Sequence, residues 1–127
     1  MRPTTVDAVI VDEGRVLLIR RKFEPFKGRW ALPGGFVDEG ETVEQAVERE
    51  AHEETGARAK VRCLIGVYSD PKRDKRGNIT VAFLMKFIGG EVRESDEADE
   101  VRWFGLGELP QLAFDHAKII EDARGML

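Results

Sequence analysis

Three glutamates at close helical spacing are the residues of this chain best suited to chemistry. Glu50, Glu53 and Glu54 occupy relative positions i, i+3 and i+4 in a segment whose pattern predicts a helix. Residues three and four apart lie on one helical face, so these carboxylates converge, and the like-charge pair Glu50 and Glu54 destabilises the helix. A cation relieves that repulsion, and hard divalent ions such as Mg²⁺ take oxygen ligands of this kind. The spacing therefore predicts a metal site.

The helix that must position these carboxylates has sequence signals at both ends. Thr42 and Gln45 form a capping-box pattern at its start, and Gly56 stands where a left-handed residue closes a helix. The predicted apolar stripe consists of Val43, Ala46, Val47 and Ala51. Because the glutamates border this stripe, we expect packing of the helix on a sheet to fix the direction of the acidic face.

Length and composition restrict the remaining classes. With 127 residues, 42% hydrophobic and 35% charged, the chain is expected to form one globular domain over residues 1–127. No apolar run approaches the roughly 20 residues that a membrane-spanning helix needs, and we see no secretory signal at the start. A net charge of −4 disfavours a nucleic-acid polymer as partner. The lone Cys63 is expected to be a buried hydrophobe, and a cytoplasmic location is the default.

The other elements follow from apolar patterning and turn residues. A hairpin is expected first, and Pro33-Gly34-Gly35 is expected to break regular structure before the acidic helix. Gly89-Gly90 is predicted to be a turn. Asp115 is the predicted N-cap of a last helix that runs through Arg124. The expected strands are Thr5–Val11, Arg15–Ile19, Trp30–Leu32, Arg58–Ser69, Ile79–Ile88, a brief Glu91–Arg93 and Val101–Phe104. Strands interrupted by one helix and followed by another indicate an α+β fold, an α/β/α sandwich around a mixed sheet.

One motif runs through the glycine loop and the acidic helix. Its fixed positions are Gly35, Glu41, Arg49-Glu50, Glu53-Glu54 and Gly56. This pattern resembles the Nudix box, with Ala51 and Ala57 at the two positions that usually hold bulky aliphatic residues. The chain is thus identified as a member of the Nudix hydrolase family, and the resemblance implies the Nudix fold across nearly its whole length.

The resemblance implies hydrolysis of a nucleoside diphosphate linked to another moiety, assisted by Mg²⁺ or Mn²⁺. It makes Glu53 and Glu54 metal ligands, and Glu50 a third ligand or the group that takes the proton of the attacking water. Gly34 is expected to lend a backbone carbonyl to the metal. Gly35 and Gly56 are expected to support the structure, as is a pair formed by Glu41 and Arg49.

A late acidic residue often enters the site in this family. Glu97 and Glu100, in the acidic run before the last expected strand, are both candidates for a metal ligand or general base. With Glu50 and Glu53, they leave four alternatives for the general base, and the sequence does not choose among them.

The segments 68–78 and 112–117 resemble those of ADP-ribose pyrophosphatases within the family. Arginines there are expected to reach a phosphate or the terminal ribose, and aromatic residues to stack on adenine. His116 is expected to be structural, and His52 a surface or packing residue. The predicted substrate contacts are Arg29, Trp30, Tyr68, Arg73, Arg76 and Phe114.

The leading hypothesis is therefore hydrolysis of ADP-ribose to AMP and ribose 5-phosphate. The alternatives are an (oxidised) nucleoside triphosphate pyrophosphohydrolase, as in 8-oxo-dGTP sanitation, and a non-catalytic module that senses ADP-ribose. The expected partner is a small nucleoside diphosphate, and an exposed β-edge would allow a homodimer.

Overall fold

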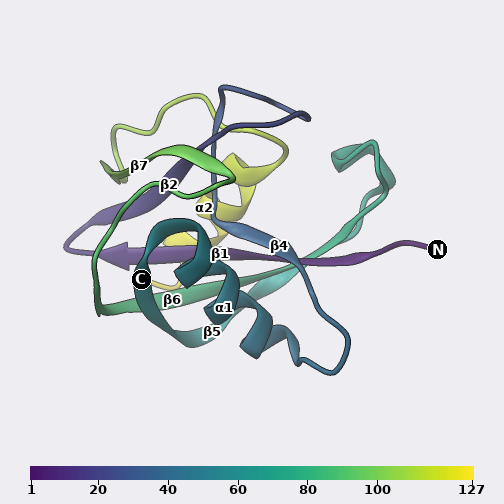
Figure 1. Cartoon of the computed structure of the whole chain (residues 1–127), viewed down its shortest axis with the longest axis horizontal. Helices are drawn as coiled ribbons and strands as arrows, with labels where there is room; N and C mark the ends of the chain where they lie inside the picture. Colours follow the sequence, from purple (N-terminus) through teal and green to yellow (C-terminus); the bar gives the residue numbers. More distant parts are fainter.

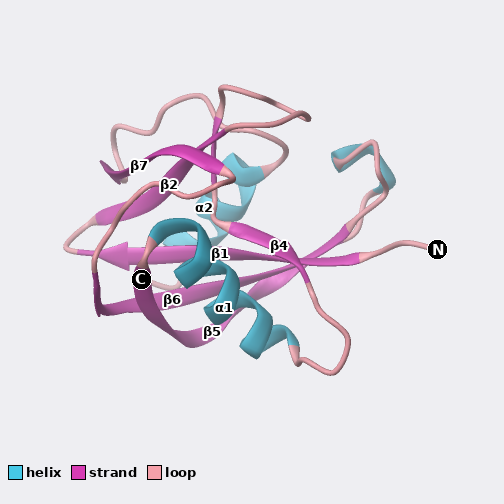
Figure 2. Cartoon of the chain, viewed as in Figure 1, coloured by secondary structure: helices cyan, strands magenta, loops and turns pink.

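A seven-stranded mixed β-sheet lies between two helices (Figures 1 and 2), in a computed structural model that describes all 127 residues. One single-turn 3₁₀ helix, η1, lies in the loop between two long strands. The elements in chain order are β1 Thr4–Asp12, β2 Arg15–Arg21, β3 Trp30–Ala31, β4 Gly34–Phe36, α1 Val43–Thr55, β5 Ala57–Tyr68, η1 Pro71–Arg73, β6 Ile79–Gly90, β7 Ala98–Gly105 and α2 His116–Arg124. No helix is long and apolar enough to cross a membrane.

Strand β1 organises the sheet. It pairs in parallel with β6 along most of its length, from Thr4 opposite Ile79 to Val11 opposite Lys86. Its other edge is shared by two antiparallel partners, with β4 at its beginning and β2 at its end. The principal strand order is β3-β2-β1-β6-β5, and β7 pairs with β2. Because β2 and β4 occupy different parts of one edge, the sheet divides beside β1.

Alternation along the strands places one helix on each face. Ala8 and Ile10 of β1 pack with α1, whereas Val9 between them packs with α2. The α1 side buries Ala46, Val47 and Ala51, and the α2 side buries Ile119, Ile120 and Ala123. The predicted α/β/α sandwich with a mixed sheet is confirmed.

Both ends of α1 form as predicted. Thr42 Oγ1 accepts a hydrogen bond from the Gln45 N–H at 3.1 Å, and Gln45 Oε1 accepts one from the Thr42 N–H at 2.9 Å. Gly56 closes the helix with φ 77°, and a side chain there would collide with the Glu91 carbonyl. The local signals thus fix where the acidic helix begins and ends.

Two predictions about glycine segments are wrong. Gly34 and Gly35 do not break regular structure, because they pair with Asp7 and Val6 as part of β4. Gly89 and Gly90 do not form a separate turn, because they extend β6 opposite Arg58 and Ala57 across a register shift. Positive φ angles of 135° and 92° let these two glycines remain in the ladder.

Three further differences lie outside the sheet centre. The expected strand at residues 91–93 is absent, since the Arg93 N–H donates to the Thr55 carbonyl at the end of α1. Asp115 precedes α2 but makes no side-chain cap bond, because its two oxygens accept hydrogen bonds from Arg73. Cys63 is exposed on β5 and not buried.

Candidate active site

Three carboxylates from two distant segments meet beside the N-terminal half of β1. Glu50 and Glu54 come from α1, and Glu97 comes from the loop between β6 and β7. One oxygen from each lies within 4.8 Å of the others. The Glu97 carbonyl accepts a hydrogen bond from the Lys22 N–H at 3.2 Å, which attaches this loop to the end of β2. The fold therefore joins acids that are more than forty residues apart in sequence.

The negative charge of this cluster is only partly balanced by positive groups of the chain. Burial raises the pKa of Glu54 well above its usual range, although a hydrogen bond from the Gly34 N–H at 2.8 Å opposes the shift. Burial also raises the pKa of Glu50, with Arg49 opposing it. Neighbouring carboxylates push both values further upward. A dense set of oxygen donors with excess negative charge fits a hard divalent cation.

Arg49 holds the acidic helix against the preceding loop. Its Nε and Nη2 donate to the two carboxylate oxygens of Glu41, both at 2.8 Å, and Nη2 also donates to the Phe36 carbonyl at 3.1 Å. Its Nη1 donates to Glu50 at 2.6 Å and to Glu53 at 3.1 Å. These bonds lower the pKa of Glu41 to about 2 and raise that of Arg49. The predicted pair between Glu41 and Arg49 is present in the structure.

The remaining acidic candidates lie in different surroundings. Glu53 stays outside the three-carboxylate cluster, with a side chain 57% exposed, but it lines an adjoining acidic depression with Glu50, Glu54 and Glu97. Glu100 is turned away, since it pairs with Arg20 at 3.3 Å and with Arg102. The structure thus brings Glu97, and not Glu100, to the acidic helix.

The two glycines of β4 lie against the cluster. Gly34 was expected to offer a carbonyl to a metal, but the contact seen is its N–H donating to Glu54. A side chain at Gly34 would collide with the Val6 carbonyl and with Asp7, and Gly35 lies directly against the Glu50 carboxylate. Strand β4 therefore contacts the carboxylates of both Glu54 and Glu50.

A cavity of about 430 Å³ extends from these acids along the division of the sheet. The rest of its lining comes from β1, β2, η1 and the segment before α2. One side of the cavity is therefore acidic, and another is basic and aromatic. A cavity of this size falls within the range of small-molecule sites. Its basic and aromatic members include Arg21, Lys22, Phe23, Arg73, Arg76 and Phe114.

The family model for the NUDIX domain matches residues 1–123. The chain belongs to the NUDIX family. The carboxylates of α1 described above are thus the glutamates of its Nudix box, and Arg49 and Glu41 are the paired residues of that box.

Relatives and solved structures match over nearly the whole chain. An ADP-ribose pyrophosphatase from Methanocaldococcus jannaschii is 56% identical over 92% of this chain and 70% of its own length. The NUDIX domain of Shewanella oneidensis NrtR, solved with ADP ribose, is 34% identical with a TM-score of 0.85, covering 99% of this chain and 88% of that one. A bifunctional NMN adenylyltransferase/ADP ribose pyrophosphatase from Francisella tularensis, solved with AMP and a manganese ion, is 31% identical with a TM-score of 0.86, covering 99% of this chain and 42% of that one. The chain spans 37% to 76% of the length of seven further curated relatives.

Three of the predicted substrate contacts line the cavity of this Nudix domain. Phe114 has a positive φ of 51°, and the guanidinium groups of Arg21 and Arg76 lie 5.1 and 5.6 Å from its ring centroid. Arg73 also lines the cavity, but its Nε and Nη2 donate to the two carboxylate oxygens of Asp115 at 2.8 and 2.7 Å. Arg73 therefore holds the segment that carries Phe114.

The other three predicted contacts, Arg29, Trp30 and Tyr68, do not line this cavity. Trp30 packs edge-on against Phe104, with ring centroids 4.8 Å apart, and Tyr68 donates to Asp122 at 2.6 Å. Arg29 is exposed and lies over the Phe26 ring. Packing and surface pairing account for all three side chains.

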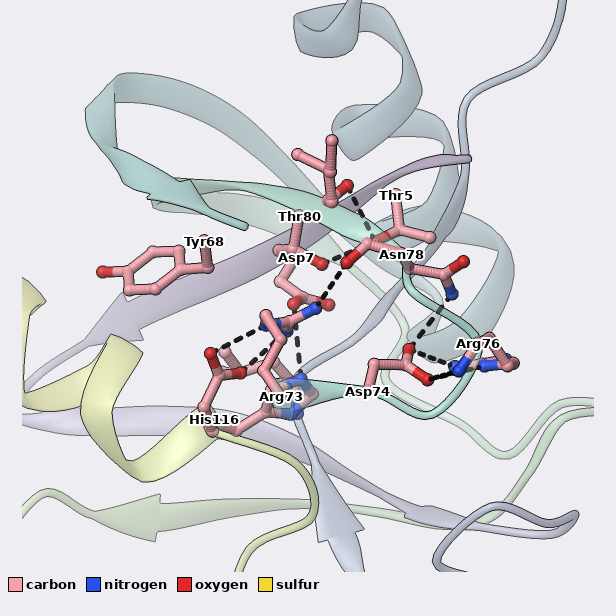
Figure 3. A network of polar contacts seen from close by, with 12 residues as sticks. Thr5, Asp7, Tyr68, Arg73, Asp74, Arg76, Asn78, Thr80 and His116 are labelled. Atoms are coloured by element: carbon pink, nitrogen blue, oxygen red, sulfur yellow. Dashed lines mark hydrogen bonds and ion pairs between the residues drawn. The ribbon is translucent and has the colours of Figure 1, made fainter. Parts of the chain in front are cut away.

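The cavity residues that the sequence does not single out include Asp7 and Arg21. Asp7 is the single charged residue in the buried run from Val6 to Ile10, a signal that could have marked it. The expected structural role of His116 agrees with its contacts: it is 3% exposed, its Nδ1 accepts from the Leu32 N–H at 3.0 Å, and its Nε2 lies 3.3 Å from Asp7 Oδ2 (Figure 3).

Proposed function

We propose that this chain hydrolyses ADP-ribose to AMP and ribose 5-phosphate, with Mg²⁺ as its metal. The observation that carries the proposal is the 56% identity to an ADP-ribose pyrophosphatase. Two structures support it, one of a related domain with ADP ribose and one of an ADP ribose pyrophosphatase with AMP. The cavity adds physical support, because it joins an acidic cluster to arginines and an aromatic ring, as an anionic nucleotide held by a cation requires.

Glu50, Glu54 and Glu97 are the residues that we propose hold the metal, with Glu53 at the rim. A bound divalent ion supplies polarisation of a phosphoryl oxygen and a lowered pKa for the attacking water. Arg49 keeps Glu50 in place, and Gly34 fixes one oxygen of Glu54. Glu97 is our candidate for taking the proton of the water, because Glu50 and Glu53 are paired with Arg49 whereas Glu97 has no cationic partner. We propose that Arg21, which lines the cavity, balances the charge of the diphosphate, with Arg76 beside it held by Asp74 at 3.0 Å.

A product assay tests this proposal. The purified chain is incubated with Mg²⁺ and a panel of ADP-ribose, NADH, dinucleoside polyphosphates, GDP-sugars and 8-oxo-dGTP, with Glu54→Gln as the inactive control. ADP-ribose should give the highest kcat/KM and release AMP. Pyrophosphate released from 8-oxo-dGTP at a higher rate would favour triphosphate sanitation, and tight binding of ADP-ribose without product would favour a sensor.

Mn²⁺ is a second metal for the same assay, and the cytoplasmic location stays a prediction. A homodimer is a proposal supported by β5, which forms an edge of the sheet and exposes Leu64 and Val67. Sedimentation equilibrium at micromolar concentration tests it, and a monomer mass throughout would contradict it.

A further inference from the structure

A buried carboxylate on β1 has no assigned role in the metal site. Asp7 is 7% exposed and lies between neighbours on β1 that are fully buried, yet it lines the cavity. Burying a carboxylate is costly unless it is paired or hydrogen-bonded. Within ion-pair distance His116 is the only partner of Asp7, while Arg21, Arg73 and Glu54 act on it at longer range. Such an incompletely satisfied group indicates that a ligand completes the contacts.

His116 fixes which oxygen of Asp7 remains available. Because His116 Nδ1 accepts a hydrogen bond from Leu32, a neutral imidazole carries its proton on Nε2, which faces Asp7 Oδ2 at 3.3 Å. Asp7 Oδ1 lies on the side of Gly34, where a side chain would collide with it. The contact with His116 is made by Oδ2, which leaves Oδ1 for a ligand. One acceptor oxygen is thus held in place at the wall of the cavity.

The surroundings of this oxygen fit a nucleobase better than a sugar. Leu32, Ile19 and Phe114 line the same cavity and supply apolar and aromatic surface for a flat ring. Adenine carries an amino group at position 6, whereas guanine and hypoxanthine carry a carbonyl oxygen there. A carboxylate oxygen attracts the first and repels the second.

We propose that Asp7 determines base specificity by accepting a hydrogen bond from the 6-amino group of adenine, with His116 as its positioning residue. This inference rests on the proposed function, since it names how the same site reads the base of ADP-ribose. A single free oxygen matches the single amino group of adenine, whereas the adjacent N–H donors of guanine would engage both oxygens of a carboxylate.

The test compares kcat/KM for ADP-ribose, IDP-ribose and GDP-ribose in the wild type and in Asp7→Asn. The wild type should prefer ADP-ribose over IDP-ribose by roughly 10- to 100-fold, as expected for one buried hydrogen bond replaced by repulsion. In Asp7→Asn the amide oxygen faces the His116 N–H, so the amide N–H₂ points into the cavity and favours a carbonyl. The ratio should then fall by at least about tenfold. Asp99→Asn, an exposed residue paired with Arg20, should leave the ratio unchanged.

Several outcomes would overturn the inference. Equal turnover of ADP-ribose and IDP-ribose by the wild type would do so without any variant, as would a preference for GDP-ribose. An equal loss on all substrates in Asp7→Asn would mean that Asp7 supports the structure or the ribose and not the base. If the wild type cleaves none of the three, the proposed function fails. The base preference is then tested separately by comparing the affinities for AMP and IMP, measured by calorimetry.

Discussion

Replacing Glu97 by glutamine is the sharpest test of the metal site, because the chain provides a matched control three residues away. Glu97→Gln removes one charge from the three-carboxylate cluster and keeps the size of the side chain. Glu100→Gln makes the same chemical change in the same acidic run, where the carboxylate pairs with Arg20 and Arg102. If the cluster binds metal, only the first substitution should impair catalysis.

The geometry sets the expected size of the effect. Two unit charges no more than 4.8 Å apart repel by at least about 3 kcal/mol at an effective dielectric constant of about 20. Glu97 is exposed, so solvent screening reduces this to about 1–2 kcal/mol of stability regained without metal. The melting temperature of Glu97→Gln in EDTA should therefore exceed that of the wild type by a few degrees. With Mg²⁺ the loss of a ligand should lower kcat/KM by on the order of 100-fold and raise the half-saturating Mg²⁺ concentration.

The assay follows ADP-ribose hydrolysis across a Mg²⁺ titration, together with thermal melts in EDTA and in saturating Mg²⁺. Glu100→Gln should stay within about twofold of the wild type, since exposed ion pairs contribute little. A strong loss in Glu100→Gln with near-normal turnover in Glu97→Gln would refute the assignment. A Glu97→Gln variant destabilised in EDTA would refute the electrostatic reasoning even if activity fell.

Three other substitutions test residues that lie outside the three-carboxylate cluster. Arg49→Lys cannot reproduce the two-pronged contact with Glu41, so kcat/KM should fall by roughly 10- to 100-fold, and steady-state turnover near the wild-type rate would contradict the role of Arg49. Tyr68→Phe should leave kcat/KM for ADP-ribose unchanged, because Tyr68 lies outside the cavity, and a raised KM would restore it as a substrate contact. Glu41 has its pKa lowered to about 2, so its stabilising contribution is complete above its ordinary pKa near 4.5 and is lost as the pH falls toward 2. Melts of the wild type and Glu41→Gln should therefore differ at pH 6 and converge toward pH 2, and a constant difference would exclude the ion pair as the cause.

The parts of the site that the sequence predicted are those with local signals. The capping box at Thr42, the closing Gly56 and the spacing of the glutamates all act within one helix, so a linear pattern contains them. The partner of Arg49 was also local, eight residues away in the loop that enters the helix. These features need no knowledge of how the chain folds back on itself.

The choice between Glu97 and Glu100 depends on tertiary structure. Both precede or begin β7, and the orientation of each follows from the register of β7 against β2, which shifts between Arg20 and Arg21. That shift leaves Glu100 beside Arg20 and places the loop with Glu97 against Lys22. The sequence also does not indicate that the Tyr68 and Trp30 side chains lie outside the cavity. An aromatic residue near a functional loop looks the same in sequence whether it faces the cavity or the core.

The division of the sheet beside β1 explains why one site has both an acidic and a base-recognising part. Asp7 and Gly34 are opposite one another in the pairing of β1 with β4, and the Gly34 N–H donates to Glu54 on α1. The Asp7 carboxylate is therefore tied to the acidic cluster through a single glycine, and a displacement of β4 would alter both. Any bulkier residue at position 34 would strike the Val6 carbonyl and the Asp7 carboxylate. Gly34→Ala should therefore raise the half-saturating Mg²⁺ concentration and also lower the preference for ADP-ribose over IDP-ribose. Glu97→Gln should raise the half-saturating Mg²⁺ concentration but leave the ratio of ADP-ribose to IDP-ribose turnover unchanged.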